Sequence, residues 1–450
     1  MFKYIIILAA GAWFLYSLFY KTHWIAVLLF TCVIADINFD LPGSPLNFRS
    51  LVAFLLFVKV ITDQTKVPGP SFISTPYAKY AFIFVAYALG ITYLNDLLNA
   101  GIVKEYLFAL LCAYLGYYYY MKEGSYKVFR LSIIIAGFSC LGDLAWTYVQ
   151  GGGLWIQRIY FSFTPAFAIF NHNFFGYICS LAFVFLLADY LTDNANNKSN
   201  LLLMPCMFMG VLLSTSRSSL LILIIISVVL IAKGMASKKN GKKAYKLVMV
   251  TISCLVLTLF LFQMLTSVFH VSSEFLEQIT ARLIDEPVAV INRAMGNSFK
   301  AESLDSMDWR AEASQIAYDT YVGKLEASEQ MFGIGHEGFL ARNYGYEGVY
   351  DAHNGVLLML IEFGVVGSAI YLFMLLGFFT KFWSLKLFSP LLVCMIFIIM
   401  YITSHNREII SFFVFLIGGT MAAQLKYYYL DETEVATDEL PEIPNEFQQT

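Results

Sequence analysis

The sequence predicts an all-α, polytopic membrane protein. Of its 450 residues, 59% are hydrophobic and 14% are charged, which is far more apolar than the composition of soluble domains. The apolar residues form runs of about 17 to 25, the length that a helix needs to cross a hydrocarbon core roughly 30 Å thick. Lysines gather in a few of the segments between these runs, as they do in the cytoplasmic loops of membrane proteins.

About 12 transmembrane helices (12–13) are predicted from these runs. The run at 23–37 is short and could be a half-helix or a re-entrant piece. The run at 2–20 follows a single lysine and lacks a signal-type cleavage site, so we expect a retained helix. The candidate spans are 2–20, 23–37, 48–62, 77–94, 103–120, 128–149, 166–190, 201–215, 217–233, 246–268, 353–380, 387–404 and 408–425.

The lysine distribution orients the helices. The segment 233–246, "KGMASKKNGKKAYK", carries six lysines and no acid, so we expect it in the cytoplasm. Counting spans outward from it places 121–130 and 381–386 on the same side. The acidic tail, 426–450, also falls inside, and its composition predicts disorder.

The same count places one large loop, 269–352, on the outer side. It separates a first membrane region, 1–268, from a second, 353–425. The loop holds six basic residues against fourteen acids, and its segment 305–327 predicts a helix that the glycines of "FGIGHEGF" end. Long structured loops are usually functional, so we expect this loop to contribute to the site.

Arginines on the outer side are the first candidates for binding. Arg217 in "STSRSS" opens a span at the outer face, although cations in membrane proteins prefer the cytoplasmic side. Placing a charge at this depth costs free energy, which indicates an anionic partner. A snorkelling anchor is the alternative reading. Arg49 and Arg158 fall on the same side and Arg310 lies in the loop, so together the four suit a pyrophosphate. Singly, each could pair with a loop acid.

His353 is the candidate base. In "YDAHNGVLLMLIEFGVVG", 350–367, Asp351 predicts an N-cap and places His353 in the first helical turn. A helix N-terminus disfavours a cation, which keeps imidazole neutral and able to activate a sugar hydroxyl. Alternatively, His353 and Asn354 only cap the helix. "FNHNFFG" repeats the pattern of a His/Asn cluster, with Asn173, at a helix start.

Three stretches around the large loop carry a family resemblance. "STSRSSLL", "WRAEASQIAYDTYVGKLEASEQMFGIGHEGF" and "DAHNGVLLMLIEFGVVGSAIYL" occur in this order, and "FNHNFFGYICSLA" precedes them. This combination resembles the O-antigen ligase/O-antigen polymerase superfamily over roughly 155–425. Each motif alone is common, so the order and the combination carry the resemblance.

The resemblance implies a multi-pass glycosyltransferase of the bacterial inner membrane whose active site faces the periplasm. Its donor would be an undecaprenyl-pyrophosphate-linked glycan, and its acceptor would be a glycan or a lipid. Membrane lipids would surround the protein. Arg217 and Arg310 match the family's arginines, which would hold the diphosphate, and His353 matches the histidine that would serve as base. Arg49 and Arg158 come from topology alone, and Asn354, Asp351 and Asn173 are candidates for supporting the site because of their places at helix starts.

No cofactor is expected. The seven cysteines are scattered without a CxxC pair, and no HExxH, Walker or dinucleotide motif occurs, so the sequence predicts neither a metal nor a nucleotide site. We expect no nucleic-acid partner, while a chain-length regulator is a candidate protein partner. The segment "FGIGHEGF", 332–339, corresponds to the family's Gly-x-Gly segment, and we use that name for it below. Its residues His336 and Glu337 depart from the family pattern and have no assigned role.

The two main candidate functions differ in the acceptor that receives the glycan. A polymerase adds the growing chain to a lipid-linked repeat unit, and "NHNFFG" with the tyrosine-rich composition favours this branch. A ligase, which adds the glycan to lipid A-core, is the close alternative. A flippase or polysaccharide exporter would line a path through many helices with charges, whereas here the polar residues gather at the outer ends and in one loop. The absence of internal repeats disfavours a small-molecule transporter.

Overall fold

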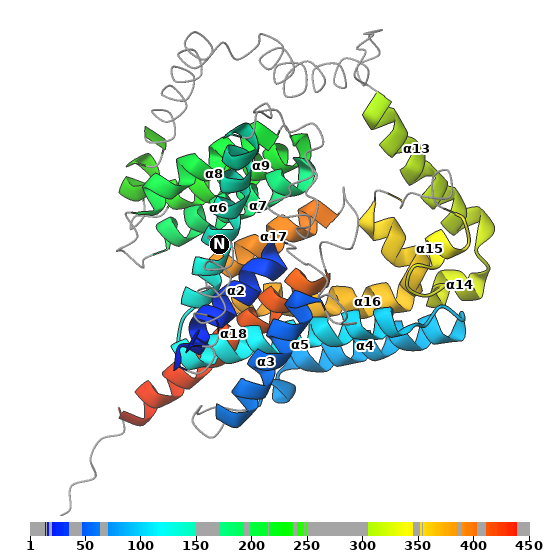
Figure 1. Cartoon of the computed structure of the whole chain (residues 1–450), viewed down its shortest axis with the longest axis horizontal. Coiled ribbons are helices and arrows are strands. Elements are labelled where there is room, and N and C mark those ends of the chain that lie inside the picture. Colours follow the sequence, from blue (N-terminus) through cyan, green and yellow to red (C-terminus); the bar gives the residue numbers. More distant parts are fainter. Residues whose placement is uncertain are drawn as a thin grey trace, which may run out of the picture.

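Every regular element that the structure describes is a helix. The computed structural model describes residues 14, 16, 17, 20–35, 47–63, 71–149, 172–192, 199–214, 216–236, 241–246, 248–249, 305–344, 352, 354–385, 389–402 and 411–438. Within these ranges the chain forms a packed set of helices, with a smaller group of loop helices at one side (Figure 1). The predicted all-α class is confirmed.

Helices occupy the predicted spans that fall on described residues. They are α2 (Thr22–Ile34), α3 (Phe48–Asp63), α4 (Pro76–Leu94), α5 (Ala100–Glu123), α6 (Lys127–Val149), α7 (His172–Leu191), α8 (Asn200–Ser214), α9 (Arg217–Ala236), α16 (Gly355–Ser384), α17 (Pro390–Ile402) and α18 (Ser411–Asp438). The predicted spans 2–20 and 246–268 lie largely outside the described residues.

Five of these helices are long and apolar enough to cross a membrane: α4, α5, α7, α9 and α16. The helices α2, α8 and α17 are apolar but shorter. The chain is therefore a multi-pass membrane protein. The total of about 12 spans and the sidedness of the loop remain predictions.

The large loop contains helices, as predicted. In its described part, α13 (Asp305–Asp319) continues into a π-helical turn, η4 (Thr320–Lys324), and two short helices follow, α14 (Ala327–Phe332) and α15 (Gly338–Ala341). A capping box starts α14: the Glu326 side chain accepts from the backbone of Glu329, and the Glu329 carboxylate accepts from Glu326 N at 3.0 Å.

Two apolar clusters divide the described residues, and α16 belongs to both. The large cluster holds the helical bundle and includes Phe363 and Tyr371. The small cluster joins the loop helices to the first turns of α16 through Phe339, Leu358 and Ile361. At 30 residues α16 is about 45 Å long, well beyond what a span needs, so its first turns can belong to the loop while the rest belongs to the bundle.

The acidic tail is helical further than predicted. We expect disorder from 426 onward, but α18 continues to Asp438. The chain has neither glycine nor proline between Thr420 and Pro441, so nothing interrupts the helix. Tyr427 also packs against the end of α5, where its ring lies 6.3 Å from that of Tyr120. The helix therefore reaches further than expected, while the disorder of the tail as a whole stays a prediction.

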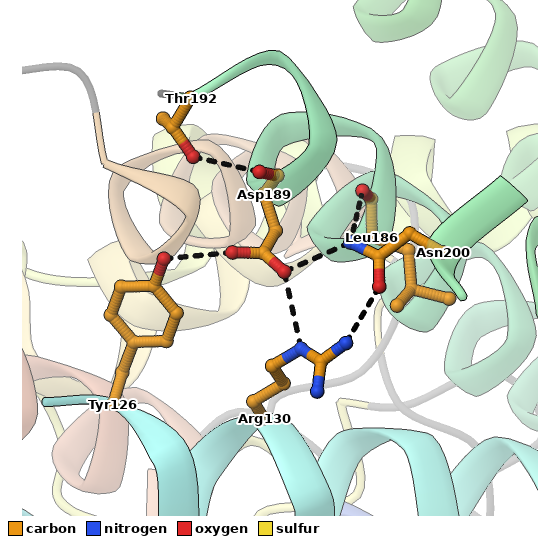
Figure 2. Close-up of polar contacts among 6 residues, drawn as sticks. All are labelled: Tyr126, Arg130, Leu186, Asp189, Thr192 and Asn200. Atoms are coloured by element: carbon orange, nitrogen blue, oxygen red, sulfur yellow. Dashed lines mark hydrogen bonds and ion pairs between the residues drawn. The ribbon is translucent and has the colours of Figure 1, made fainter. Parts of the chain in front are cut away.

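A buried polar network ties α6, α7 and α8 together (Figure 2). The buried carboxylate of Asp189 accepts hydrogen bonds from the Tyr126 hydroxyl at 2.7 Å, Arg130 Nε at 3.1 Å and Asn200 Nδ2 at 2.9 Å. Arg130 Nη2 also donates to Asn200 Oδ1 at 2.7 Å. Because each buried group has a partner, the network can stabilise the packing of these three helices.

Candidate functional site

Asn354 marks the start of α16. Its side-chain oxygen accepts hydrogen bonds from Val356 N and Leu357 N, both at 3.2 Å, which is the geometry of an N-cap. The helix begins at Gly355, two residues later than the predicted span, with Asn354 and not Asp351 as its N-cap. Asp351 and His353 themselves lie outside the described residues.

Arg217 is the first residue of α9 and follows a serine turn. In this turn Ser216 N donates to Ser214 Oγ at 3.2 Å, and Ser216 Oγ donates to Ser219 Oγ at 2.9 Å. The three serines are buried and Arg217 is partly buried. The serines therefore fix the turn, which holds the arginine at the helix N-terminus.

The start of α7 lies against this turn. A Cβ at Gly176 would come within 2.5 Å of Ser214 Oγ and 2.7 Å of Ser216 Cβ, so glycine allows the close approach. Asn173 lies three residues before Gly176 on the same helix. Its backbone carbonyl accepts a hydrogen bond from the Tyr401 hydroxyl of α17 at 3.2 Å. The structure thus brings the "NHNFFG" and "STSRSS" motifs together.

Arg49 packs between aromatic rings. It is 7% exposed, and its guanidinium lies 5.4 Å from the ring centre of Phe108 on α5 and 4.7 Å from that of Phe412 on α18. Cation–π contacts of this kind stabilise a buried arginine. Arg49 therefore has a packing role that joins three helices, and its predicted contact with a diphosphate remains a prediction.

Arg310 belongs to the loop group. It lies on α13, whose Ser314 Oγ donates to the carbonyl of Ala352, just before α16, at 3.3 Å. Figure 1 shows α13 apart from α9. Arg310 on α13 and Asn354 at the start of α16 therefore belong to the loop group, whereas Asn173 and Arg217 belong to the starts of α7 and α9. Arg158 lies outside the described residues. The predicted convergence of four arginines is therefore neither shown nor contradicted.

The Gly-x-Gly segment connects the loop to the bundle, a role that the sequence does not reveal. His336 N donates to Thr92 Oγ1 at 2.9 Å, and His336 Nδ1 lies 3.0 Å from the Tyr106 hydroxyl. Glu105 is close by, with its Oε2 3.8 Å from His336 Nε2. His336 therefore joins the loop to the end of α4 and the start of α5. Glu337 precedes α15 with a positive φ of 62°.

A second connection runs through Arg342. Its Nη1 donates to Glu329 Oε1 at 2.6 Å, and its Nη2 donates to Asn95 Oδ1 at 2.9 Å. Burial opposes ionisation of Glu329, but the hydrogen bonds from Arg342 and from Glu326 N, together with the charge of Arg342, lower its pKa below the ordinary 4.5. The guanidinium thus links α14, α15 and the end of α4.

A groove of about 450 Å³ lies beside this link, between α4 and α14. Its walls are largely apolar and include Ile91, Leu94 and Phe332. The polar groups at its edge, Asn95 and Glu329, are already bonded to Arg342. Its lining is mostly apolar and the two polar side chains nearest the link are engaged by Arg342, so we do not assign the groove to the site.

The pair of Glu329 and Arg342 predicts acid sensitivity. Because the folded-state pKa of Glu329 is lowered, the pair stabilises the fold fully above about pH 4.5 and loses this contribution as pH falls through the lowered pKa. Melting temperatures of the wild type and Glu329→Gln should therefore differ at pH 7 and converge as the pH falls through the lowered pKa of Glu329. The exposed Glu312→Gln is the control and should follow the wild type throughout. A constant difference at all pH values would contradict the assignment.

Glu362 is a buried residue that the sequence does not single out. Its side chain is 0% exposed on α16, and its backbone carbonyl accepts a hydrogen bond from Gly335 N at 2.8 Å. An ionisable side chain inside an apolar helix is costly and indicates function. Spacing alone gives no such signal, because nine residues separate Glu362 from His353.

The comparison with known families agrees with the motifs. Residues 202–372 match the family described as O-antigen ligase, a range that includes Arg217, Arg310, the Gly-x-Gly segment and the first half of α16. No curated protein matches the chain. Members of this family are membrane glycosyltransferase-like enzymes of O-antigen biosynthesis. The chain therefore carries, at residues 202–372, a domain that matches the O-antigen ligase family, in agreement with the motifs around its large loop.

Proposed function

We propose that this protein is an O-antigen polymerase, a surface-polysaccharide glycosyltransferase of the bacterial inner membrane. It would transfer a glycan from undecaprenyl pyrophosphate to a lipid-linked repeat unit on the periplasmic side. The observation that carries the proposal is the family match at 202–372, which contains the predicted base and two of the predicted diphosphate-binding arginines. The apolar helices that flank this domain support an acceptor and a donor that are both held in the membrane.

The proposed chemistry is a single displacement. The acceptor hydroxyl oxygen forms a bond with the anomeric carbon of the donor glycan, and the bond from that carbon to the pyrophosphate breaks. His353 takes the hydroxyl proton or orients the hydroxyl, while Arg217 and Arg310 stabilise the negative charge of the leaving undecaprenyl pyrophosphate. The pyrophosphate supplies the driving force, so this step calls for neither a nucleotide nor a metal.

The structure adds support for Arg217. The buried serine turn holds this arginine at the N-terminus of α9, where the helix dipole favours an anion. The packing of the turn against Gly176 also brings the α7 motif close to it. A guanidinium beside helix N-H groups is well suited to bind a phosphate.

An O-antigen ligase is the second candidate, favoured by the description of the matching family. The donor and the chemistry would be the same, and the acceptor would be lipid A-core. A flippase or exporter is a less favoured alternative, because the candidate charges lie at helix starts and on a loop helix instead of lining a path.

Complementation distinguishes these functions. The chromosomal gene is deleted in the native host, and lipopolysaccharide is separated on a gel. Core carrying a single repeat unit indicates a missing polymerase, and the full ladder should return when the wild-type protein is supplied. Core without any repeat unit, with lipid-linked polymer accumulating in the membrane, would indicate a ligase. An unchanged ladder after deletion would contradict both transferase functions.

A further inference from the structure

The helix α16 is broken at Gly364, and the loop occupies the break. Gly364 has φ 63° and ψ −174°, so the helix direction changes there. The carbonyls of Ile361 and Glu362, just before the break, accept hydrogen bonds from Ile334 N at 3.1 Å and Gly335 N at 2.8 Å. The Gly-x-Gly segment therefore supplies the donors at a place where a continuous helix would bond to itself.

Three glycines make this contact possible. Gly333, Gly335 and Gly364 all have a positive φ, between 63° and 88°. A Cβ at Gly364 would clash with the carbonyl of Met331 and come within 2.5 Å of Gly333 N, and a Cβ at Gly333 would clash with the carbonyl of Glu362. Both the backbone conformation and the close approach therefore require glycine.

Tyr87 on α4 closes the arrangement from the other side. Its hydroxyl lies 2.7 Å from the carbonyl of Phe332 and 3.1 Å from the carbonyl of Phe363, one in the loop and one in α16. Its ring also lies against Gly367, where a Cβ would come within 2.5 Å of Tyr87 Cε1. One hydroxyl thus bridges the two segments that the glycines bring together. We call Phe332–Gly335 with its partners Tyr87 and Ile361–Gly364 the α16 clip.

The clip lies at the point from which the direction of the first turns of α16 is set. In the first turns of α16, Leu358 and Ile361 are buried in the small loop cluster and only the partly buried Met359 packs against the bundle cluster, so the loop cluster contributes most to their direction. Asn354 lies ten residues before Gly364, a lever of about 15 Å. A change of only a few degrees at the break would therefore move the start of α16 by about 1 Å, enough to slow a positioned reaction by up to about 100-fold.

We propose that the α16 clip holds the start of α16, and with it the chain position of His353, in register with the rest of the bundle. Tyr87 and Gly364 are then positioning residues for glycan transfer and do not touch the substrate. This inference rests on the proposed transferase function, although the clip itself can be tested without any substrate.

Amide hydrogen exchange on the purified full-length protein in lipid nanodiscs tests the clip directly. The amides of Ile334 and Gly335 should be protected in the wild type and should exchange faster in Gly364→Ala. Gly377→Ala is the matched control, because it lies on the same helix with open space around a Cβ, and it should keep the protection. Unprotected amides in the wild type would contradict the clip, whatever the activity.

Turnover tests the positioning role. With purified lipid-linked substrate, Tyr87→Phe should lower kcat about tenfold per folded molecule with KM changed less than twofold, and Gly364→Ala should lower it more. Tyr80→Phe is the control, an exposed tyrosine on the same helix, and should be unaffected. In the Gly364→Ala background, Tyr87→Phe should add little, because both act through the same contact.

Two results would overturn the positioning role. The first is a Tyr87→Phe protein whose activity falls only in proportion to its folded fraction, as expected of a residue that contributes to stability alone. The second is a wild-type protein with protected amides that transfers no glycan. That result would contradict the proposed function and reduce the clip to a structural link.

Discussion

Replacing Asp189 by alanine should destabilise the protein by about 3–5 kcal/mol, the usual cost of leaving a buried charge without its partner. The carboxylate accepts hydrogen bonds from three side chains in the network of Figure 2, among them Arg130 at 3.1 Å. Removing it leaves the guanidinium, whose side chain is 21% exposed, without its counter-charge and with Asn200 Oδ1 as its remaining partner in the network. Thermal or denaturant unfolding in detergent measures the loss, and a lower yield of membrane-inserted protein should accompany it.

Two further variants provide an intermediate case and a control for this measurement. Tyr126→Phe removes one hydrogen bond and leaves the ion pair, so it should cost about 1 kcal/mol. Asp319→Ala changes an exposed aspartate on α13 that accepts from Gln315, and it should have little effect. A similar loss for Asp189→Ala and Asp319→Ala would show that the network does not carry the stability assigned to it.

Replacing His353 by alanine should slow glycan transfer by about 10²- to 10⁴-fold, the usual contribution of a general base. The reason is chemical: without the imidazole, the acceptor hydroxyl loses its proton to water alone. Turnover of purified lipid-linked substrate measures the rate, and the lipopolysaccharide ladder of complemented cells reports it in vivo. Protein abundance must match the wild type for the comparison to hold.

Arg217 supplies the companion test. Arg217→Ala should also abolish the ladder, and Arg217→Lys should restore it poorly, because an ammonium cannot bind two phosphate oxygens through a planar fork. His23→Ala on α2 is the control and should leave the ladder intact. If His353→Ala and Arg217→Ala both gave a normal ladder at normal abundance, the catalytic assignment would be wrong.

The helices were predictable from the sequence because length and hydropathy determine them. The runs at 77–94 and 217–233 differ from α4 and α9 by three residues or fewer at each end. The serine turn before Arg217 was also predictable, since serines cap helix starts. These features depend on local chemistry, and a sequence displays local chemistry directly.

The contacts of the Gly-x-Gly segment were not predictable in this way. Its partners Tyr87 and Thr92 lie more than two hundred residues earlier in the chain, and no local pattern relates them to His336. The break in α16 has a partial signal in Gly364, but a glycine in an apolar helix equally indicates close helix packing. The extension of α18 to Asp438 was not predicted, because acidic composition, which predicts disorder, was given more weight than the lack of helix breakers.

The α16 clip also bears on the order in which the protein is made. Tyr87 is joined to residues that follow it by 245 and 276 positions, so α4 is synthesised and inserted long before its partners exist. The two halves of the clip, Phe332 and Phe363, leave the ribosome within about thirty residues of each other. The loop and α16 can therefore associate first and dock on α4 afterwards. Assembly of the candidate site is then one of the last steps of biogenesis, and a chain that ends before residue 332 would insert its early helices without ever completing it.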